Sequence, residues 1–166
     1  NMILFGLVLM AFPTAAKLGN AAAKAVSSTT GIIIQFPLYA GIMGVMKYSG
    51  LLVVITHWFV SVSTPQTLPL LSFLSAALVN LFVPSGGGQW AVQGPVLIEA
   101  AGLVGVGYAK EVMALAYGDQ LTNMLQPFWA LPLLGITGLK AGQILKYSLS
   151  FMLIGLVVFC LALLIF

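Results

Sequence analysis

Residues 79–95 of the sequence read VNLFVPSGGGQWAVQGP. The polar, glycine-rich part of this stretch lies between two apolar segments that have the composition of helices. Successive glycines carry no Cβ, so their backbone N–H groups can converge on an anion, and the following helix presents its positive N-terminus to the same place. A carboxylate would therefore bind well at Ser85, Gly86, Gly87, Gly88 and Gln89.

The depth of this glycine tip in a membrane separates two interpretations. Glu99 follows Gly88 by about 16 Å of helix, so a tip near the middle of the bilayer places Glu99 at the surface. A helix that crossed the whole bilayer would bury Glu99 at a cost of about 2.5–3.5 kcal/mol. We therefore favour a re-entrant hairpin over residues 68–108 with its tip at 84–89. The alternative is a surface turn anchored by Trp90.

The composition of the chain excludes the soluble classes of protein. Of its 166 residues, 61% are hydrophobic and 5% are charged, and the mean hydropathy is +1.12. A soluble domain carries about 25% charged residues, so this chain has too few to cover a folded surface in water. The basic residues are scattered lysines, so no nucleic acid partner is expected. One histidine and one cysteine cannot build an ordinary metal site, and we expect neither a metal nor a cofactor.

The hydropathy pattern predicts a single all-α transmembrane domain over residues 1–166, embedded in a lipid bilayer. Its expected segments are transmembrane helices at 2–12, 31–47, 51–64 and 147–166, the re-entrant hairpin at 68–108, and a broken transmembrane helix at 112–139. No basic residue precedes 2–12, so we interpret this segment as a truncated transmembrane helix of a longer protein and not as a signal peptide. Residues 13–30 fit a short interfacial helix and a surface loop equally well.

The broken segment at 112–139 contains the second polar constellation. Asp119 lies about 13 Å along a helix from Lys110, which places it near the middle of the bilayer. An acid at that depth is functional by default. Three further polar side chains share its helical face because they follow it at i+3, i+4 and i+7, namely Thr122, Asn123 and Gln126. Hydrogen bonding between helices is the alternative role for this stripe.

Other polar residues carry weaker signals. His57 stands beside Trp58 in an apolar segment, and a satisfied bundle residue is favoured there over a proton relay. We expect Asn80 to brace the hairpin. The Tyr117-Gly118-Asp119 sequence is similar to the second motif of intramembrane aspartyl proteases, but that chemistry needs two aspartates and Asp119 is the only one present. An enzyme is therefore not expected.

Three runs of the sequence resemble one known family. They are IIIQFPLYAGIMGVM at 32–46, the stretch at 79–95, and AYGDQLTNMLQPFWALPLLGI at 116–136. Together they resemble the C-terminal half of the bacterial short-chain fatty acid transporter family, within the wider ion transporter superfamily. The resemblance implies one repeat of an inverted-repeat transporter, here the second, with the re-entrant hairpin at 68–108 and an unwound helix at 112–139. The N-terminal half of the same transporter is the implied partner, and a homodimer is a further alternative.

The resemblance also implies a function. It implies import of short-chain fatty acids such as acetoacetate or butyrate across the bacterial inner membrane by a multi-pass carrier, in symport with H⁺ or Na⁺. The tip residues named above would bind the carboxylate, with further substrate contacts from Trp90, Thr122, Asn123, Gln126, Phe128 and Trp129. Asp119 and Asn123 would take the coupling ion, either a proton or Na⁺. The chain has no arginine that could clamp a second carboxylate, which favours monocarboxylates.

Two questions stay open at the level of sequence. The positive-inside rule gives a tie, because the lysines divide three against three between the two sides of the membrane. The resemblance breaks this tie by placing Lys47, Lys140 and Lys146 inside. Alternative functions are a carrier of another organic anion, a Na⁺/H⁺ antiporter of the same superfamily, and a membrane scaffold that does not transport. The scaffold predicts a dry bundle around Asp119.

Overall fold

The computed structural model describes residues 1–126 and 130–166, and their side chains except at 27–32, 35–36, 39 and 131–132. The described part of the chain is all-helical, which confirms the predicted class. Its helices are α1 (Met2–Ala11), α2 (Ala15–Tyr48), α3 (Leu51–Ser61), α4 (Leu68–Asn80), α5 (Gly86–Val104), α6 (Tyr108–Asn123), α7 (Leu131–Thr137) and α8 (Ala141–Ile165).

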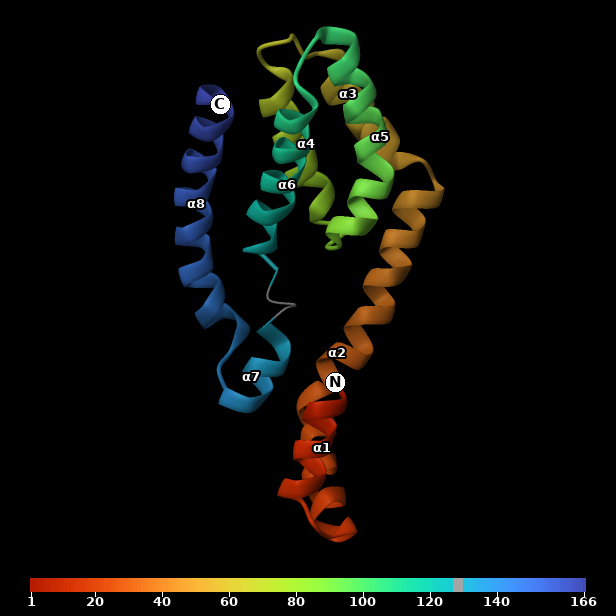
Figure 1. Cartoon of the computed structure of the whole chain (residues 1–166), viewed down its shortest axis with the longest axis vertical. Coiled ribbons are helices and arrows are strands. Elements are labelled where there is room, and N and C mark those ends of the chain that lie inside the picture. Colours follow the sequence, from red (N-terminus) through yellow and green to blue (C-terminus); the bar gives the residue numbers. More distant parts are fainter. Residues whose placement is uncertain (127–129) are drawn as a thin grey trace.

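Most of the packing between helices lies at one end of an elongated molecule. Helices α3, α4, α5 and α6 pack together, and α8 runs alongside α6 (Figure 1). The long helix α2 leaves this bundle and carries α1 at its far end, while α7 lies against α2. The N-terminal arm of the molecule is thus separate from the bundle that holds the polar residues of interest.

Two features fix where α5 begins and ends. The Ser85 side chain accepts a hydrogen bond from the Gly88 backbone N–H at 3.3 Å and so caps the N-terminus of α5. At the other end, Gly105 adopts a positive φ of 78°, which terminates the helix without a steric penalty. The predicted tip at 84–89 is therefore shorter in the structure, because the capped helix already starts at Gly86.

The contact between α4 and α6 depends on Gly118. A Cβ atom at Gly118 would be 2.6 Å from Ala76 Cβ and 2.8 Å from the Ala77 nitrogen, so only glycine allows the two backbones to approach this closely. Around this crossing, an apolar cluster joins α4, α6 and α8 through Phe73, Ala77, Ala114, Leu121 and Leu163. Gly118 of the Tyr-Gly-Asp sequence thus has a packing role.

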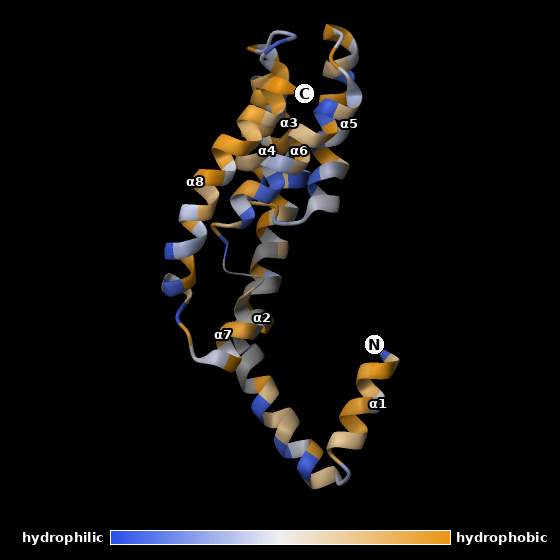
Figure 2. Cartoon of the chain, turned by 60° about the vertical axis from the view of Figure 1, so that its left-hand side comes forward, coloured by the Kyte–Doolittle hydropathy of each residue, from blue (hydrophilic) through white to orange (hydrophobic). Residues whose placement is uncertain are grey.

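Several helices are apolar enough on their outer surface to lie in a membrane. Helix α8 is long and apolar enough to cross a bilayer, and only Leu163 of its residues is buried. Two bent helix pairs pass the same test together, Met2–Ala11 with Ala15–Val26 at 119° and Ala40–Tyr48 with Leu51–Ser61 at 61°. The shorter helix α4 is apolar as well. Hydrophobic residues dominate the outer surface of α1 and α8 (Figure 2).

Some helix bounds differ from those expected from hydropathy. Helix α2 is continuous from Ala15, so residues 15–30 are helical and belong to the same element as the segment predicted at 31–47. Helix α8 begins at Ala141 and not at 147, because the Gln143 side chain accepts a hydrogen bond from the Lys140 backbone N–H at 2.8 Å. Polar capping of this kind lies outside the apolar run that hydropathy detects.

Candidate functional site

Asn80, the last residue of α4, is the centre of a buried polar cluster. Its side chain is fully buried, and its Nδ2 lies 2.8 Å from the Asp119 carbonyl oxygen, 3.0 Å from Thr122 Oγ1 and 3.0 Å from Asn123 Oδ1. All three acceptors belong to the last two turns of α6. Hydrophilic residues are concentrated in this part of the bundle, where α4, α5 and α6 meet (Figure 2). Asn80 was expected to brace the hairpin at 68–108, but its side-chain hydrogen bonds go to α6 and attach the end of α4 to that helix.

Two further side chains attach the end of α6 to the end of α4. Thr122 Oγ1 donates to the Ala77 carbonyl oxygen at 2.9 Å. Gln126 Nε2 donates to the carbonyl oxygens of Asn80 and Leu81, at 3.0 and 3.2 Å. Helix α6 ends at Asn123 and α7 starts at Leu131, so Gln126 lies in the connection between them. Of the stripe predicted from helical spacing, Thr122 and Asn123 thus face α4 from within α6, whereas Gln126 reaches the end of α4 from outside the helix.

Asp119 faces the N-terminus of α5. A Cβ atom at Gly86 would lie 3.6 Å from Asp119 Oδ2 and 3.8 Å from Asp119 Oδ1. Oδ2 also accepts a hydrogen bond from Asn123 Nδ2 at 3.3 Å. The first backbone N–H groups of a helix have no acceptor within the helix, and they give its N-terminus a partial positive charge. The structure thus brings the predicted coupling residue and the predicted anion site together.

Three oxygen atoms of this cluster are buried without a hydrogen-bond donor among the described residues. They are Asn80 Oδ1, Asp119 Oδ1 and Gln126 Oε1. A buried acceptor without a partner carries the desolvation penalty of a lost hydrogen bond, about 1–3 kcal/mol for a neutral group. Each of these oxygens could still accept a hydrogen bond or contact a small cation.

Gln89 was predicted as a substrate ligand, and its side chain lies away from the exposed tip. It is fully buried, and its Nε2 donates to the Ala76 carbonyl oxygen at 2.8 Å and to Gln93 Oε1 at 2.7 Å. Gln93 Nε2 continues the chain to Thr56 Oγ1 at 3.0 Å and Ser75 Oγ at 3.1 Å. This network joins α3, α4 and α5 directly behind the tip. A direct substrate contact by Gln89 stays a prediction.

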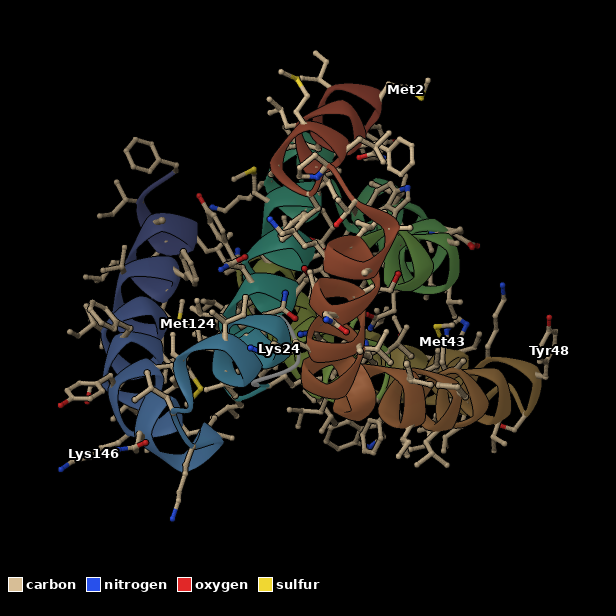
Figure 3. The ribbon with its side chains drawn as sticks, turned by 90° about the horizontal axis from the view of Figure 1, so that it is seen from below. Met2, Lys24, Met43, Tyr48, Met124 and Lys146 are labelled. Atoms are coloured by element: carbon tan, nitrogen blue, oxygen red, sulfur yellow. The ribbon has the colours of Figure 1, made fainter. Side chains whose placement is uncertain are left out.

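The aromatic residues expected to form an apolar wall are only partly described. The Trp90 ring packs along α5 over Gly94, and a Cβ atom added at Gly94 would lie 2.8 Å from the ring. The Trp90 side chain remains 40% exposed. Phe128 and Trp129 lie outside the described residues. Met43 of α2 also reaches the tip, since a Cβ at Gly88 would be 3.7 Å from its sulfur atom. Figure 3 shows Met43 on the side of α2 that is turned towards α5, whereas Tyr48 and Lys146 point outwards.

Two other polar residues singled out in the sequence are remote from this cluster. His57 on α3 and Glu99 on α5 are both exposed at the surface of the chain. Within the described ranges, no group of three or more His, Cys, Asp and Glu side chains lies close enough to hold a metal ion. A separate cavity of about 280 Å³ lies between α6 and α8, with Lys110, Tyr117 and Phe166 in its lining.

Sequence reasoning did not single out Glu111, which the structure buries to 1% exposure. It stands in the first turn of α6, and neither of its carboxylate oxygens has a hydrogen bond among the described residues. In the sequence it follows Lys110 at the edge of an apolar segment, where a charged residue normally marks the membrane surface. Only the packing of α6 against its neighbours reveals its burial.

Comparison with known proteins gives a consistent result. The sequence model of a family described as "Short chain fatty acid transporter" matches residues 1–166. A protein of Escherichia coli (strain K12) named "Putative short-chain fatty acid transporter" is 47% identical over 161 residues, which cover 97% of this chain and 36% of that protein. A protein of the same name from Haemophilus influenzae is 46% identical over 148 residues, covering 89% of this chain and 33% of that protein. The chain spans about a third of the length of these curated relatives. No solved structure matches it.

Proposed function

Because the chain belongs to the short-chain fatty acid transporter family, we propose that it forms part of a membrane carrier of short-chain fatty acid anions. The family is one of transporters and not of enzymes. The proposed substrates are monocarboxylates of the acetoacetate and butyrate type. The proposed location is the bacterial inner membrane, which the carrier crosses several times.

The N-terminus of α5 is the proposed anion site. Gly86 and Gly87 lie in its first turn and are exposed, and no Cβ blocks the approach of a ligand to their N–H groups. One such helix end supplies one anion site, which fits a substrate with one carboxylate. Residues 1–166 contain no arginine, so this part of the site offers no bidentate clamp for a second carboxylate. We therefore propose monocarboxylates as the substrates.

The observation that carries the coupling proposal is the position of Asp119 beside Gly86. An ionised Asp119 and a substrate carboxylate would compete for the same positive helix end and would repel each other. Neutralisation of Asp119 by a proton or by Na⁺ removes both effects. Substrate loading would therefore require a cation, and transport would be symport with H⁺ or Na⁺.

The residues that would hold this cation are those with unsatisfied oxygens. Asp119 Oδ1, Asn80 Oδ1 and Gln126 Oε1 lack donors among the described residues, and Asn123 contacts the other Asp119 oxygen. In carriers with broken helices, coupling ions bind where side-chain and backbone oxygens gather at a helix break. Asp119 and Asn123 thus remain the proposed coupling residues, to which the structure adds Asn80 and Gln126.

The complete site would need a second part. Asp119 is half-buried and Gly86, Gly87 and Ser85 are exposed, so one side of the cluster is open in this chain. Inverted-repeat carriers form their substrate site between two repeats. We propose that the remaining two thirds of a transporter such as the curated relatives, or a second copy of the chain, cover this side.

The test is uptake of labelled butyrate by the full-length protein in proteoliposomes. Uptake is expected to exceed that of empty vesicles, to rise with an inward H⁺ or Na⁺ gradient, and to be inhibited by acetoacetate but not by succinate. Comparing the two gradients separately identifies the coupling ion. Inhibition by succinate alone would indicate a carrier of another organic anion, and Na⁺ release without butyrate uptake would indicate an antiporter. Either result would overturn the proposal.

A further inference from the structure

The carboxyl group of Glu111 lies inside the protein and outside the cluster around Asp119. Glu111 is 1% exposed and faces α4, where its polar neighbour is Ser72. The Ser72 hydroxyl interacts with the carboxyl group, but the contact lacks the geometry of a full hydrogen bond, since Ser72 Oγ and both Glu111 oxygens have no hydrogen-bond partner among the described residues. Three oxygens are therefore buried together and unsatisfied.

The surroundings of this group are apolar. Along their helices, Leu68 and Ala76 lie one turn before and after Ser72, and Leu115 lies one turn after Glu111. These three belong to two clusters of buried side chains, Leu68 with Ala100 and Ala101, and Ala76 with Leu97 and Leu115. The burial is produced by this chain itself. Segments of a longer protein cannot contact Glu111 without first displacing these helices, so its environment is already complete, in contrast to that of Asp119.

No positive charge compensates Glu111 within the described ranges. Helix α4 carries no titratable side chain, and α5 carries only Glu99, which is exposed. Helix α3 contributes the exposed His57. The titratable groups of the other neighbouring segments are Tyr108, Lys110, Tyr117 and Asp119 on α6 itself, and Lys146, Tyr147 and Cys160 on α8. None of them makes an ion pair or a hydrogen bond with the Glu111 oxygens.

The chemistry of the site favours a proton over a metal cation. A cation such as Na⁺ or Ca²⁺ needs several oxygen ligands, and this site offers only one carboxyl group and one hydroxyl group. A proton, in contrast, needs only one oxygen atom to which it can bind. A protonated Glu111 also has an O–H group that can donate to Ser72 Oγ, which satisfies the donor and one of the unpaired acceptors at once.

We propose that Glu111 and Ser72 form a proton-binding site of this protein, separate from the cluster around Asp119. An unpaired carboxylate in an apolar interior is strongly disfavoured, so the packed state of α4 on α6 holds the proton. In states in which α6 separates from α4, water reaches Glu111 and the proton is released. The proton therefore stabilises the same α4–α6 contact that places Asp119 beside the tip. The site belongs to the folded chain and does not depend on which substrate the protein carries.

Infrared spectroscopy of the full-length protein in lipid vesicles tests the proposal. A protonated carboxyl group gives a C=O band apart from those of carboxylates. At neutral pH this band is expected in the parent protein, lost in Glu111→Gln and shifted in Ser72→Ala, which retains the acid but removes its acceptor. Glu99→Gln, the same change at an exposed site, is the control and is expected to leave the band unaltered.

A second measurement uses the melting temperature of the same proteins as a function of pH. The packed state binds a proton that the unfolded chain releases, so the parent is expected to lose stability as the pH rises, whereas Glu111→Gln retains its acidic-pH value. A band that persists unchanged in both Glu111→Gln and Ser72→Ala, or no band in the parent, overturns the proposal. Butyrate uptake by the parent vesicles is measured in parallel, so failure of this inference is distinguished from failure of the proposed function.

Discussion

The Asp119 carboxylate lies against Gly86, with only 3.6 Å between Asp119 Oδ2 and the position that a Cβ atom of Gly86 would occupy. This contact joins the last two turns of α6 to the first turn of α5. It places a negative charge at the helix end that is best suited to bind an anion. In the proposed mechanism, Asp119 and an incoming carboxylate would compete for this helix end, and the charge of Asp119 would control access to it.

Replacing Asp119 by Asn is expected to uncouple transport. The amide retains the size of the side chain and can still pair with Asn123, but it cannot take up a proton or balance a Na⁺ ion. Accumulation of butyrate against a gradient should be lost, while exchange down a gradient is retained. Gradient-driven uptake and counterflow in reconstituted full-length protein measure the two activities. If Asp119→Asn accumulates butyrate like the parent at matched expression, Asp119 has a structural role.

Gly118→Ala is expected to disrupt the α4–α6 contact. The added methyl group would lie 2.6 Å from Ala76 Cβ, and backbone atoms of α4 on the same side cannot move independently. Overpacking of this kind costs about 1–3 kcal/mol. The measurement is the melting temperature of the purified protein. Gly155→Ala on α8 is the matched control, since its nearest contact would be an ordinary 3.7 Å; equal melting temperatures for the two variants would contradict the structure.

Gln93→Leu is expected to destabilise the hairpin from behind its tip. The change removes the donor to Thr56 and Ser75 and the acceptor for Gln89, all in a fully buried position. Buried polar groups left without partners cost about 1–3 kcal/mol. Gln120→Leu makes the same substitution at an exposed position of α6 and serves as the control. Thermal unfolding should show a loss for Gln93→Leu alone.

Cysteine labelling should locate the tip of the hairpin. In a cysteine-free background of the full-length protein that includes Cys160→Ala, Ser85→Cys and Gly87→Cys should react with small polar thiol reagents, because both positions are exposed and Gly87 has open space around it. Gly88→Cys is avoided, since its Cβ would lie 3.1 Å from Ser85 Oγ. Substrate is expected to slow the reaction. Fast reaction with bulky impermeant reagents, unaffected by substrate, would instead indicate a surface turn.

The sequence predicted the parts of the cluster that depend on local spacing. Thr122 and Asn123 follow helical periodicity, and the structure brings both side chains to Asn80, which also bonds the backbone carbonyl of Asp119. The hairpin predicted at 68–108 covers α4 and α5, and the segment predicted at 112–139 covers most of α6 and all of α7. These features are encoded within a single helix or turn, where neighbouring residues determine the geometry.

Features that depend on packing between helices were not predictable in the same way. Gln89 belongs to the glycine-rich stretch, yet α3 and α4 enclose its side chain and supply its partners through Ala76 and Gln93. The sequence alone indicates a surface position for Glu111, and only the packing of α6 on α4 buries it. In each case, the direction of a side chain within its helix is fixed by sequence, but what covers it comes from segments far away in the chain.

The hydrogen bonds of Asn80 and Gln126 have a mechanical consequence. They attach the turn after α4 to the end of α6, so separating the two would leave several buried amide and carbonyl groups unpaired. The end of α4 and the end of α6 are thus tied to each other. A movement of either end must carry the other with it or break these hydrogen bonds, so the bonds set the cost of any rearrangement that separates the two helices.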